Sequence, residues 1–476
     1  EQAYYFFEKS KAVLLHEAMA ENGALNALPD SLRTQDLLLL ERVEKARDRL
    51  NRQREASTDY AAYVAVREAF NRFRDSLRTT GLLSSIHAEE HLPWQDLFAE
   101  GIVDTNQWII HYFVGNSHTY ALVLKPRGLH LVQVGPTTEL EDAAQKVLNY
   151  FTSSGAIVND PQGYFTAAYK LYKRIFQPLD LPQGQRLVII PDGVLTYLPF
   201  AALTTAPAFT GSFASGPYVL QRHPVTYAFS GSVLRQQQTL QTKQGVKIMA
   251  YAPFGDGTSP TGYPQLSFSN DELSGLRDIA MDLRRDSAAQ LQRFLAEVSG
   301  YRVVHLSTHA FSSPQEQSPH IAFYDSLLYL QDVYRLPLAA DLIVLSACQT
   351  NIGHNAPGEG TLGLGRGFTQ AGTRGIISSL WNVNATSTGR VLGSFYDQVA
   401  EQTEVGLALH EAKIEYLSDP ALADLQKSPY YWAGLTYYGL GQSLDLPRPT
   451  GKGWWLLAIP LVLLIGLFWW RSRTRT

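Results

Sequence analysis

Short apolar runs, almost uninterrupted by polar residues, recur through the centre of this chain and constrain its fold most strongly. Five of them lie at 186–191, 246–252, 301–306, 341–346 and 375–380, with amphipathic stretches between them. Strands that are apolar on both faces are typical of a parallel sheet whose two faces are covered by helices. From about residue 107 onward the pattern therefore predicts an α/β fold.

Other segments complete this secondary structure. A hairpin is predicted over 108–114 and 119–124, and the predicted helices lie at 288–298, 363–371, 387–401 and 405–417. Within residues 1–100, apolar residues recur at helical spacing while charged residues fill the other faces. We interpret this region as antiparallel helices joined near 57–59, the end of a helical-repeat array that continues upstream. Because the chain starts at Glu1 rather than Met, we interpret it as a fragment or a processed product.

Composition excludes several classes of function. Lys and Arg total 40 against 44 Asp and Glu, for a net charge of −4, which argues against a broadly basic nucleic-acid binder. Cys348 is the single cysteine, so an intrachain disulfide and zinc sites built from several cysteines are excluded. The glycine-rich run 358–365 lacks the GK[ST] ending of a phosphate-binding loop, and no cluster has metal-ligand spacing. We therefore expect no cofactor and no metal.

One segment near the end of the chain differs from the rest. Residues 454–470 read WWLLAIPLVLLIGLFWW, carry no charge and place tryptophans at both ends, as membrane-spanning helices do. A linker at 444–453 precedes this segment, and a basic tail at 471–476 follows it. We predict a single-pass membrane helix, with a buried core helix as the alternative. The tail has three arginines against Arg448 and Lys452 before the span, which favours a cytoplasmic tail and a body outside the cytoplasm; a tail-anchored cytoplasmic body is the rival.

Two of the apolar runs end in residues that suit nucleophilic catalysis. One run continues into His309 and the other into Cys348. Functional groups of open parallel sheets gather beyond the carboxyl ends of the strands, so on neighbouring strands these two side chains would face each other. A cysteine thiolate then attacks while the imidazole carries the proton. The alternative is a small apolar cysteine and an ordinary loop histidine. His305, inside its apolar run, is interpreted as structural.

Four longer motifs resemble one family in combination. They are LVIIPDGVLTYLPFAAL, HLSTHAFSSP, VLSACQTNIGHNAPGEGTLGLGRGFTQAGTRGIISSLWNVN and SPYYWAGLTYYG. Together they resemble the CHAT domain, a family that is related to caspases and separases and belongs to a clan with a His/Cys dyad. CHAT domains often follow tetratricopeptide repeats in their chains. The resemblance extends from near Trp108 to near Gly441. It implies a caspase-like, mostly parallel sheet with helices on both faces, a pseudo-caspase half at 107–240 and a catalytic half at 241–443.

The resemblance also implies roles for individual residues. His309 would be the general base and acid, and Cys348 the nucleophile, with the backbone N–H groups of Cys348 and Ala310 as oxyanion donors by analogy. Trp381 is a candidate for lining a substrate cleft, or else a core aromatic. Asp325 and Glu359 are candidates for binding a basic side chain before the scissile bond, or else solvated loop carboxylates.

These expectations combine into one main functional interpretation. It is a membrane-anchored cysteine endopeptidase that cleaves a protein substrate, with a regulatory protein binding to the helices of residues 1–100. One alternative is a non-catalytic scaffold or signalling protein that binds partners. Another is an acyl transferase that uses the same dyad.

Overall fold

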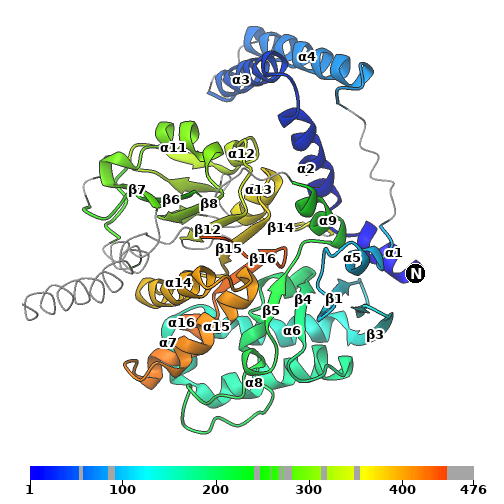
Figure 1. Ribbon diagram of the computed structural model, residues 1–476, viewed down its shortest axis with the longest axis vertical. Coiled ribbons are helices and arrows are strands. Elements are labelled where there is room, and N and C mark those ends of the chain that lie inside the picture. Colours follow the sequence, from blue (N-terminus) through cyan, green and yellow to red (C-terminus); the bar gives the residue numbers. More distant parts are fainter. Residues whose placement is uncertain are drawn as a thin grey trace, which may run out of the picture.

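A computed structural model shows how these segments assemble (Figure 1). It describes residues 1–52, 57–83, 92–240, 247–257, 259–266, 272, 281–311, 319–347, 354–356 and 358–446. Cys348 and the 454–470 segment lie outside these residues.

An eleven-stranded sheet runs through the centre of the molecule. In sheet order the strands are β3 (Gly128–Pro136), β2 (His118–Lys125), β1 (Gln107–Val114), β4 (Arg186–Ile190), β5 (Val225–Tyr227), β16 (Leu435–Gly439), β15 (Gly375–Ser379), β12 (Leu342–Ser346), β8 (Val303–Ser307), β6 (Ile248–Ala252) and β7 (Met281–Arg285). The five predicted apolar runs form β4, β6, β8, β12 and β15, and the predicted hairpin is the antiparallel pair β1–β2.

Nine of the eleven strands form two parallel halves that run in opposite directions, and β2 and β3 add an antiparallel margin to the first half. β1, β4, β5 and β16 are mutually parallel, and so are β15, β12, β8, β6 and β7. The two sets meet at β15 and β16, which pair antiparallel. The carboxyl ends of the strands in one half therefore lie at the opposite edge of the sheet from those in the other half.

Helices cover both faces of the sheet, as the apolar strands require. On β1, Ile110 and Tyr112 enter the large core shared with α6 (Thr137–Leu148) and α8 (Pro161–Ile175), whereas Ile109 faces a second core that includes Phe7 of α1 (Gln2–Lys9). The predicted helices appear as α11 (Leu291–Glu297), α13 (Leu364–Gln370), α14 (Ala385–Ala400) and α15 (Val405–Ser418). Alternation of side chains along one strand thus connects the body to the amino-terminal segment.

The amino-terminal residues are helical, as predicted. α2 (Val13–Asn26) follows α1, and α3 (Asp30–Arg52) and α4 (Ser57–Thr79) form a hairpin that projects from the body at the top of Figure 1. Arg74, near the end of α4, hydrogen-bonds through Nε to Asp36 near the start of α3 at 2.9 Å, as antiparallel helices require. Arg74 also donates to Glu21 of α2 at 2.9 Å. A partly buried ion pair network therefore joins the hairpin to α2.

The structure does not support the predicted membrane-spanning helix. In the ranges that the structure describes, no helix is both long enough and apolar enough to cross a membrane. The segment itself, 454–470, lies outside those ranges. The predicted membrane helix and the single-pass localisation that depends on it are therefore not supported.

A buried lysine supports the strand that joins the two halves. The Lys413 ammonium of α15 donates to the Leu435 carbonyl of β16 at 2.6 Å, and burial lowers the pKa of Lys413 to about 7. Its pKa in the unfolded chain is near 10.5, so between about pH 7 and 10.5 the unfolded state holds the extra proton. Through this group, stability rises with pH across that window, by at most about 1.4 kcal/mol per pH unit.

We therefore expect Lys413→Met to flatten the dependence of unfolding on pH. The free energy of unfolding, measured by denaturant titration from pH 7 to 9, should rise less steeply in this variant than in the wild type. Lys170→Met, at an exposed position on α8, is the control and should keep the wild-type slope. Identical slopes in wild type and Lys413→Met would contradict the buried, weakly protonated lysine.

Candidate catalytic edge of the sheet

β8 and β12 end at the same level, which is the condition that a dyad at this edge needs. The two strands are parallel neighbours, with Leu342 opposite Val303 and Ser346 opposite Ser307. The pairing continues past the strands, because the Thr308 amide donates to the Ser346 carbonyl at 3.2 Å. His309 follows Ser307 by two positions, and Cys348 follows Ser346 by two positions. The structure places His309 and does not describe Cys348.

A hydrogen bond to a carbonyl oxygen determines the tautomer of His309. Its Nε2 atom lies 2.9 Å from the Pro264 carbonyl oxygen. Because a carbonyl oxygen only accepts, Nε2 carries the proton, and in the neutral ring Nδ1 is left as an acceptor. A base that takes a thiol proton needs such a free acceptor nitrogen.

Aromatic side chains enclose the His309 ring. Tyr263 stacks on it with a centroid separation of 5.4 Å, and Phe254 meets it edge-on at 5.0 Å. This partial burial lowers the pKa of His309, and the Pro264 carbonyl opposes the shift by stabilising the protonated ring. The lowered pKa favours the neutral ring, which is able to accept a proton.

The backbone beside His309 is held by a small second sheet. Its strands are β9 (Ala310–Phe311), β10 (His320–Ala322) and β11 (Leu327–Tyr329), and Ala310 lies opposite Ile321. The Ala322 amide donates to the His309 carbonyl at 2.9 Å. Because amide directions alternate along an antiparallel strand, the Ala310 N–H points away from β10. An oxyanion role for the amides of Ala310 and Cys348 remains a prediction.

A buried polar network lies beneath this edge. His305 contacts the Tyr396 hydroxyl through Nδ1 and the Glu272 carboxylate through Nε2, both at 3.0 Å. Ser307 donates to the second oxygen of Glu272 at 2.7 Å. These side chains are almost fully buried, so the network braces β8 against α14. Its position inside the sheet agrees with the interpretation of His305 as structural.

Trp381, the predicted cleft residue, lies in the core of the molecule. Its indole stacks on Phe151 with centroids 4.4 Å apart, and its N–H donates to the Tyr430 carbonyl at 3.2 Å. Only 7% of Trp381 is exposed. The contacts are those of a core aromatic, and a role in substrate binding stays untested.

The two candidate acidic residues have local partners. Asp325 accepts from the Leu291 amide at 2.9 Å and so caps the first turn of α11. Glu359 accepts from the Leu14 amide at 3.1 Å and pairs with the Arg366 guanidinium. Both carboxylates are thus engaged by the chain itself. Neither arrangement tests whether they also bind a substrate.

The structure adds three residues to the predicted site. Pro264 and Tyr263 lie in the loop that follows β6, the third parallel strand to end at this edge. Tyr263 is an aromatic residue after a strand that ends at this edge, which is a signal in the sequence. Pro264 acts through its backbone carbonyl, which no residue type signals. Glu272 is remote in sequence from His305 and carries no comparable signal.

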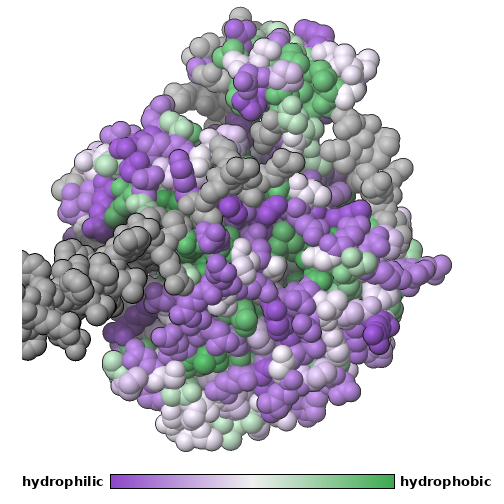
Figure 2. Space-filling view, viewed as in Figure 1, coloured by the Kyte–Doolittle hydropathy of each residue, from purple (hydrophilic) through white to green (hydrophobic). Residues whose placement is uncertain are grey.

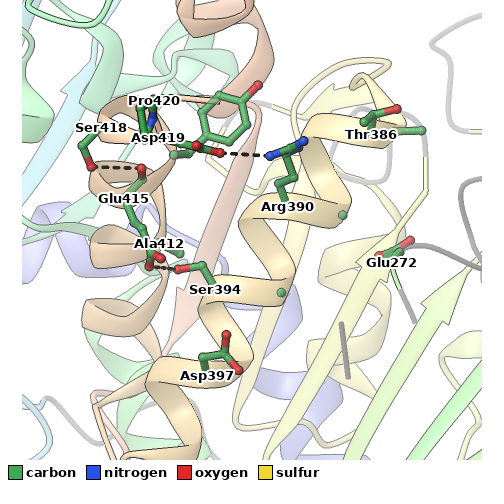
Figure 3. A pocket seen from close by; sticks show the side chains of 14 residues that line it. Glu272, Thr386, Arg390, Ser394, Asp397, Ala412, Glu415, Ser418, Asp419 and Pro420 are labelled. Carbon is green, nitrogen blue, oxygen red and sulfur yellow. Dashed lines mark hydrogen bonds and ion pairs between the residues drawn. The ribbon is translucent and has the colours of Figure 1, made fainter. Parts of the chain in front are cut away.

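A separate pocket of about 770 Å³ opens between α14 and α15 (Figure 3). Arg390 and Asp419 form an ion pair across it at 2.9 Å, and Ser394 hydrogen-bonds to Glu415. None of the predicted site residues lines this pocket, although Glu272 of the buried network does. Within the described part of the chain, no group of three or more His, Cys, Asp or Glu residues could hold a metal ion.

Comparison with known proteins identifies relatives. The CHAT domain family matches residues 166–440. Tetratricopeptide repeat protein 28 of Mus musculus is 29% identical over 121 residues, a match that spans 25% of this chain and 5% of that protein; its Homo sapiens counterpart matches equally.

Two solved structures resemble the fold at low sequence identity. The Saccharomyces cerevisiae separase–securin complex matches with a TM-score of 0.44 and 11% identity, covering 81% of this chain and 34% of that chain. The complex of Porphyromonas gingivalis RgpB pro- and mature domains matches with a TM-score of 0.36 and 13% identity, covering 65% of this chain and 78% of that one.

The environment of His309 leads to a measurable expectation. In a Cys348→Ala variant, NMR titration of the His309 ring should give a pKa below the ordinary value of about 6.5, because burial disfavours the charged ring. Tyr263→Ala uncovers the ring and should move the pKa back toward that value. Leu295→Ala, at an exposed position of α11, should leave it unchanged. A His309 pKa above 6.5 in the Cys348→Ala variant would contradict the proposed environment.

Proposed function

Because the chain belongs to the CHAT domain family, we propose that it is a cysteine endopeptidase with Cys348 as nucleophile and His309 as general base and acid. The observation that carries the proposal is the matched ending of β8 and β12, together with the tautomer of His309. Ser307 and Ser346 lie opposite each other, and His309 and Cys348 each follow their strand's serine by two residues. The hydrogen bond to the Pro264 carbonyl keeps the proton on Nε2, so Nδ1 can accept the thiol proton.

The reaction follows from these two groups. Nδ1 of His309 accepts the proton of the Cys348 thiol, and the thiolate attacks the scissile carbonyl to form the C–S bond. The Ala310 and Cys348 amides would stabilise the oxyanion. His309 then gives its proton to the departing amine as the C–N bond breaks. Water, deprotonated by His309, hydrolyses the acyl-enzyme and regenerates the thiol.

We further propose that residues 1–100 form a regulatory module for this peptidase. The Ala12 amide donates to the Gly358 carbonyl at 2.9 Å, and the Leu14 amide donates to the Glu359 carboxylate at 3.1 Å. The junction between α1 and α2 thus contacts the loop that follows Cys348 in sequence. A change in the position of α2 would reach that loop directly.

The α3–α4 hairpin offers a surface for a protein partner. Leu37 and Leu38 of α3 are each 51% exposed, and Tyr60 of α4 is 61% exposed. Figure 2 shows apolar surface gathered on this hairpin. Exposed apolar faces of this kind mark protein interaction sites. A regulatory protein bound here would act through Arg74 and Glu21 on α2.

The first test removes each member of the dyad. Cys348→Ala and His309→Ala should each lower peptide cleavage by about a thousandfold or more, since nucleophile and base act as one unit. Loss of His309 also removes ring contacts with Tyr263 and Phe254, so a small drop in melting temperature is expected there. Activity would be measured on a peptide library and folding by thermal melting.

Labelling of Cys348 and analysis of the reaction products separate the rival functions. An electrophilic peptide should label Cys348 in the wild type and fail to label Cys348→Ala. Absence of cleavage and labelling in a folded wild type would favour a non-catalytic scaffold. Products that carry an added amine or thiol instead of a free carboxylate would favour an acyl transferase. A Cys348→Ala protein that still cleaves peptides would overturn the mechanism.

The regulatory proposal is tested at Glu359, because α1 and α2 cannot be deleted without exposing core residues such as Tyr4, Phe7 and Leu15. Glu359→Gln weakens the links to Leu14 and Arg366 and should lower kcat/KM by about five- to a hundredfold, the range of typical coupling energies. Glu139→Gln, which breaks the exposed ion pair with Arg174, is the matched control. Unchanged kinetics in a folded Glu359→Gln protein would count against coupling through this loop.

A further inference from the structure

A cluster of aromatic rings beside His309 is open to solvent. Phe311 packs on Tyr263 and on His320, with centroid separations of 5.4 and 5.3 Å, and His320 contacts Tyr329 at 5.7 Å. Phe311 is 37% exposed, and the other three side chains are half-buried. We call Tyr263, Phe311, His320 and Tyr329 the aromatic shelf.

Contacts within the chain hold the rings of the shelf together. The Tyr263 hydroxyl lies 3.0 Å from Nε2 of His320, and Phe311 and His320 lie opposite each other on β9 and β10. The Leu266 amide donates to the Phe254 carbonyl at 2.7 Å, which closes the loop that carries Tyr263. A preformed aromatic surface gains binding energy from burial without an entropic cost of ordering.

The order of strands places the shelf on one side of the catalytic edge. From β12 the sheet continues to β8 and then β6. The nucleophile follows β12, the base follows β8, and Tyr263 follows β6. Tyr263 stacks directly on the base, with its ring plane 24° from that of His309. Along the sheet, His309 therefore lies between the shelf and the end of β12, the strand that leads to the nucleophile.

The chemistry determines which part of a substrate reaches that side. When the scissile carbonyl is bonded to Cys348, the departing nitrogen must lie next to His309, because His309 supplies its proton. The residue attached to that nitrogen continues past His309 toward β6. The acyl portion of the substrate stays on the Cys348 side.

We propose that the aromatic shelf is the subsite for the first residue on the leaving-group side of the scissile bond, and that it selects large apolar or aromatic side chains there. This inference rests on the proposed peptidase function. The four shelf side chains offer aromatic surface and include neither a carboxylate nor an ammonium group. An acidic residue at that position would lose water, and none of these four side chains supplies a Lys or Arg cation to it.

The cleavage arm of the test starts from one peptide that the wild type cuts. Versions of it that carry Phe, Leu, Gly or Asp immediately after the scissile bond are compared by kcat/KM. The wild type should prefer Phe and Leu over Asp by about tenfold or more, the discrimination typical of one apolar pocket. Phe311→Ala should reduce the rates for Phe and Leu by about tenfold and leave the Gly peptide nearly unchanged. Leu295→Ala, 40% exposed on α11, is the matched control.

A binding arm separates this inference from the proposed function. In the Cys348→Ala background, the tripeptide amide Phe-Ala-Ala, with a free amino terminus, mimics the leaving product, and Asp-Ala-Ala amide is its control. Calorimetry should detect binding of the first and a loss of at least fivefold in affinity with Phe311→Ala. Phe311→Leu, which keeps apolar volume, should retain most of the affinity and guards against misfolding.

Each outcome has a distinct meaning. Cleavage with the same loss for all four peptides in Phe311→Ala would show that Phe311 only supports His309, and would overturn the subsite. Cleavage without any preference at that position would do the same and leave the peptidase intact. Binding of Phe-Ala-Ala amide that depends on Phe311, in a protein that cleaves nothing, would overturn the peptidase function and leave the binding surface. Equal binding of both tripeptides would overturn the selectivity.

Discussion

The pairing of β16 with β15 and β5 holds this molecule together as one sheet. β16 is the last strand in sequence, yet it lies between the two parallel halves, antiparallel to β15 and parallel to β5. Tyr438 stacks between Tyr227 and Phe229 at 5.1 and 4.9 Å. Gly439 has φ +147°, and a Cβ there would come within 2.6 Å of the Gly375 Cα. Only glycine permits this close approach of the two backbones. Without the pairing of β15 with β16, each half of the sheet would have an unpaired edge strand at this position.

Because the strand direction reverses at this seam, the carboxyl ends of the strands in the two halves lie at opposite edges of the sheet. The β8 and β12 ends carry His309 and lead to Cys348 at one edge. At the opposite edge β4 leads to Asp192, which accepts from the Val114 amide at 2.7 Å and pairs with Lys11 of the amino-terminal segment. Burial lowers the pKa of Lys11, and Asp192 opposes that shift. The first half thus uses its strand ends to anchor the amino-terminal helices, while the strand ends of the second half bear His309 and lead to Cys348.

A small set of contacts fixes the tautomer, the hydration and the backbone of His309, which is the base of the proposed reaction. A carbonyl oxygen selects the tautomer, aromatic rings reduce hydration, and an antiparallel pair fixes the backbone on which the side chain stands. The carbonyl and the rings both come from the segment that follows β6, and the antiparallel pairing comes from β10. The aromatic shelf continues the same set of rings away from the base, so orientation of the base and recognition of a substrate would share one structure.

Local patterns in the chain are enough to locate β4, β6, β8, β12 and β15, because each is a short apolar run bounded by turn residues. The same reasoning identified His309 and Cys348 as strand-end residues. It missed β5 and β16, since VTY and LTYYG are too short to show a periodic pattern. For Trp381, Asp325 and Glu359 it left a substrate-binding role and an ordinary structural role open, and the fold gives each of them partners within the chain. Sheet order, the reversal at β16, the register that matches Ser307 with Ser346, and the partners Pro264 and Glu272 depend on contacts between residues far apart in sequence. Hydrophobic periodicity indicates which face of a segment is buried, but it does not indicate which other segment packs beside it. The neighbours of each strand depend on the packing of the whole chain.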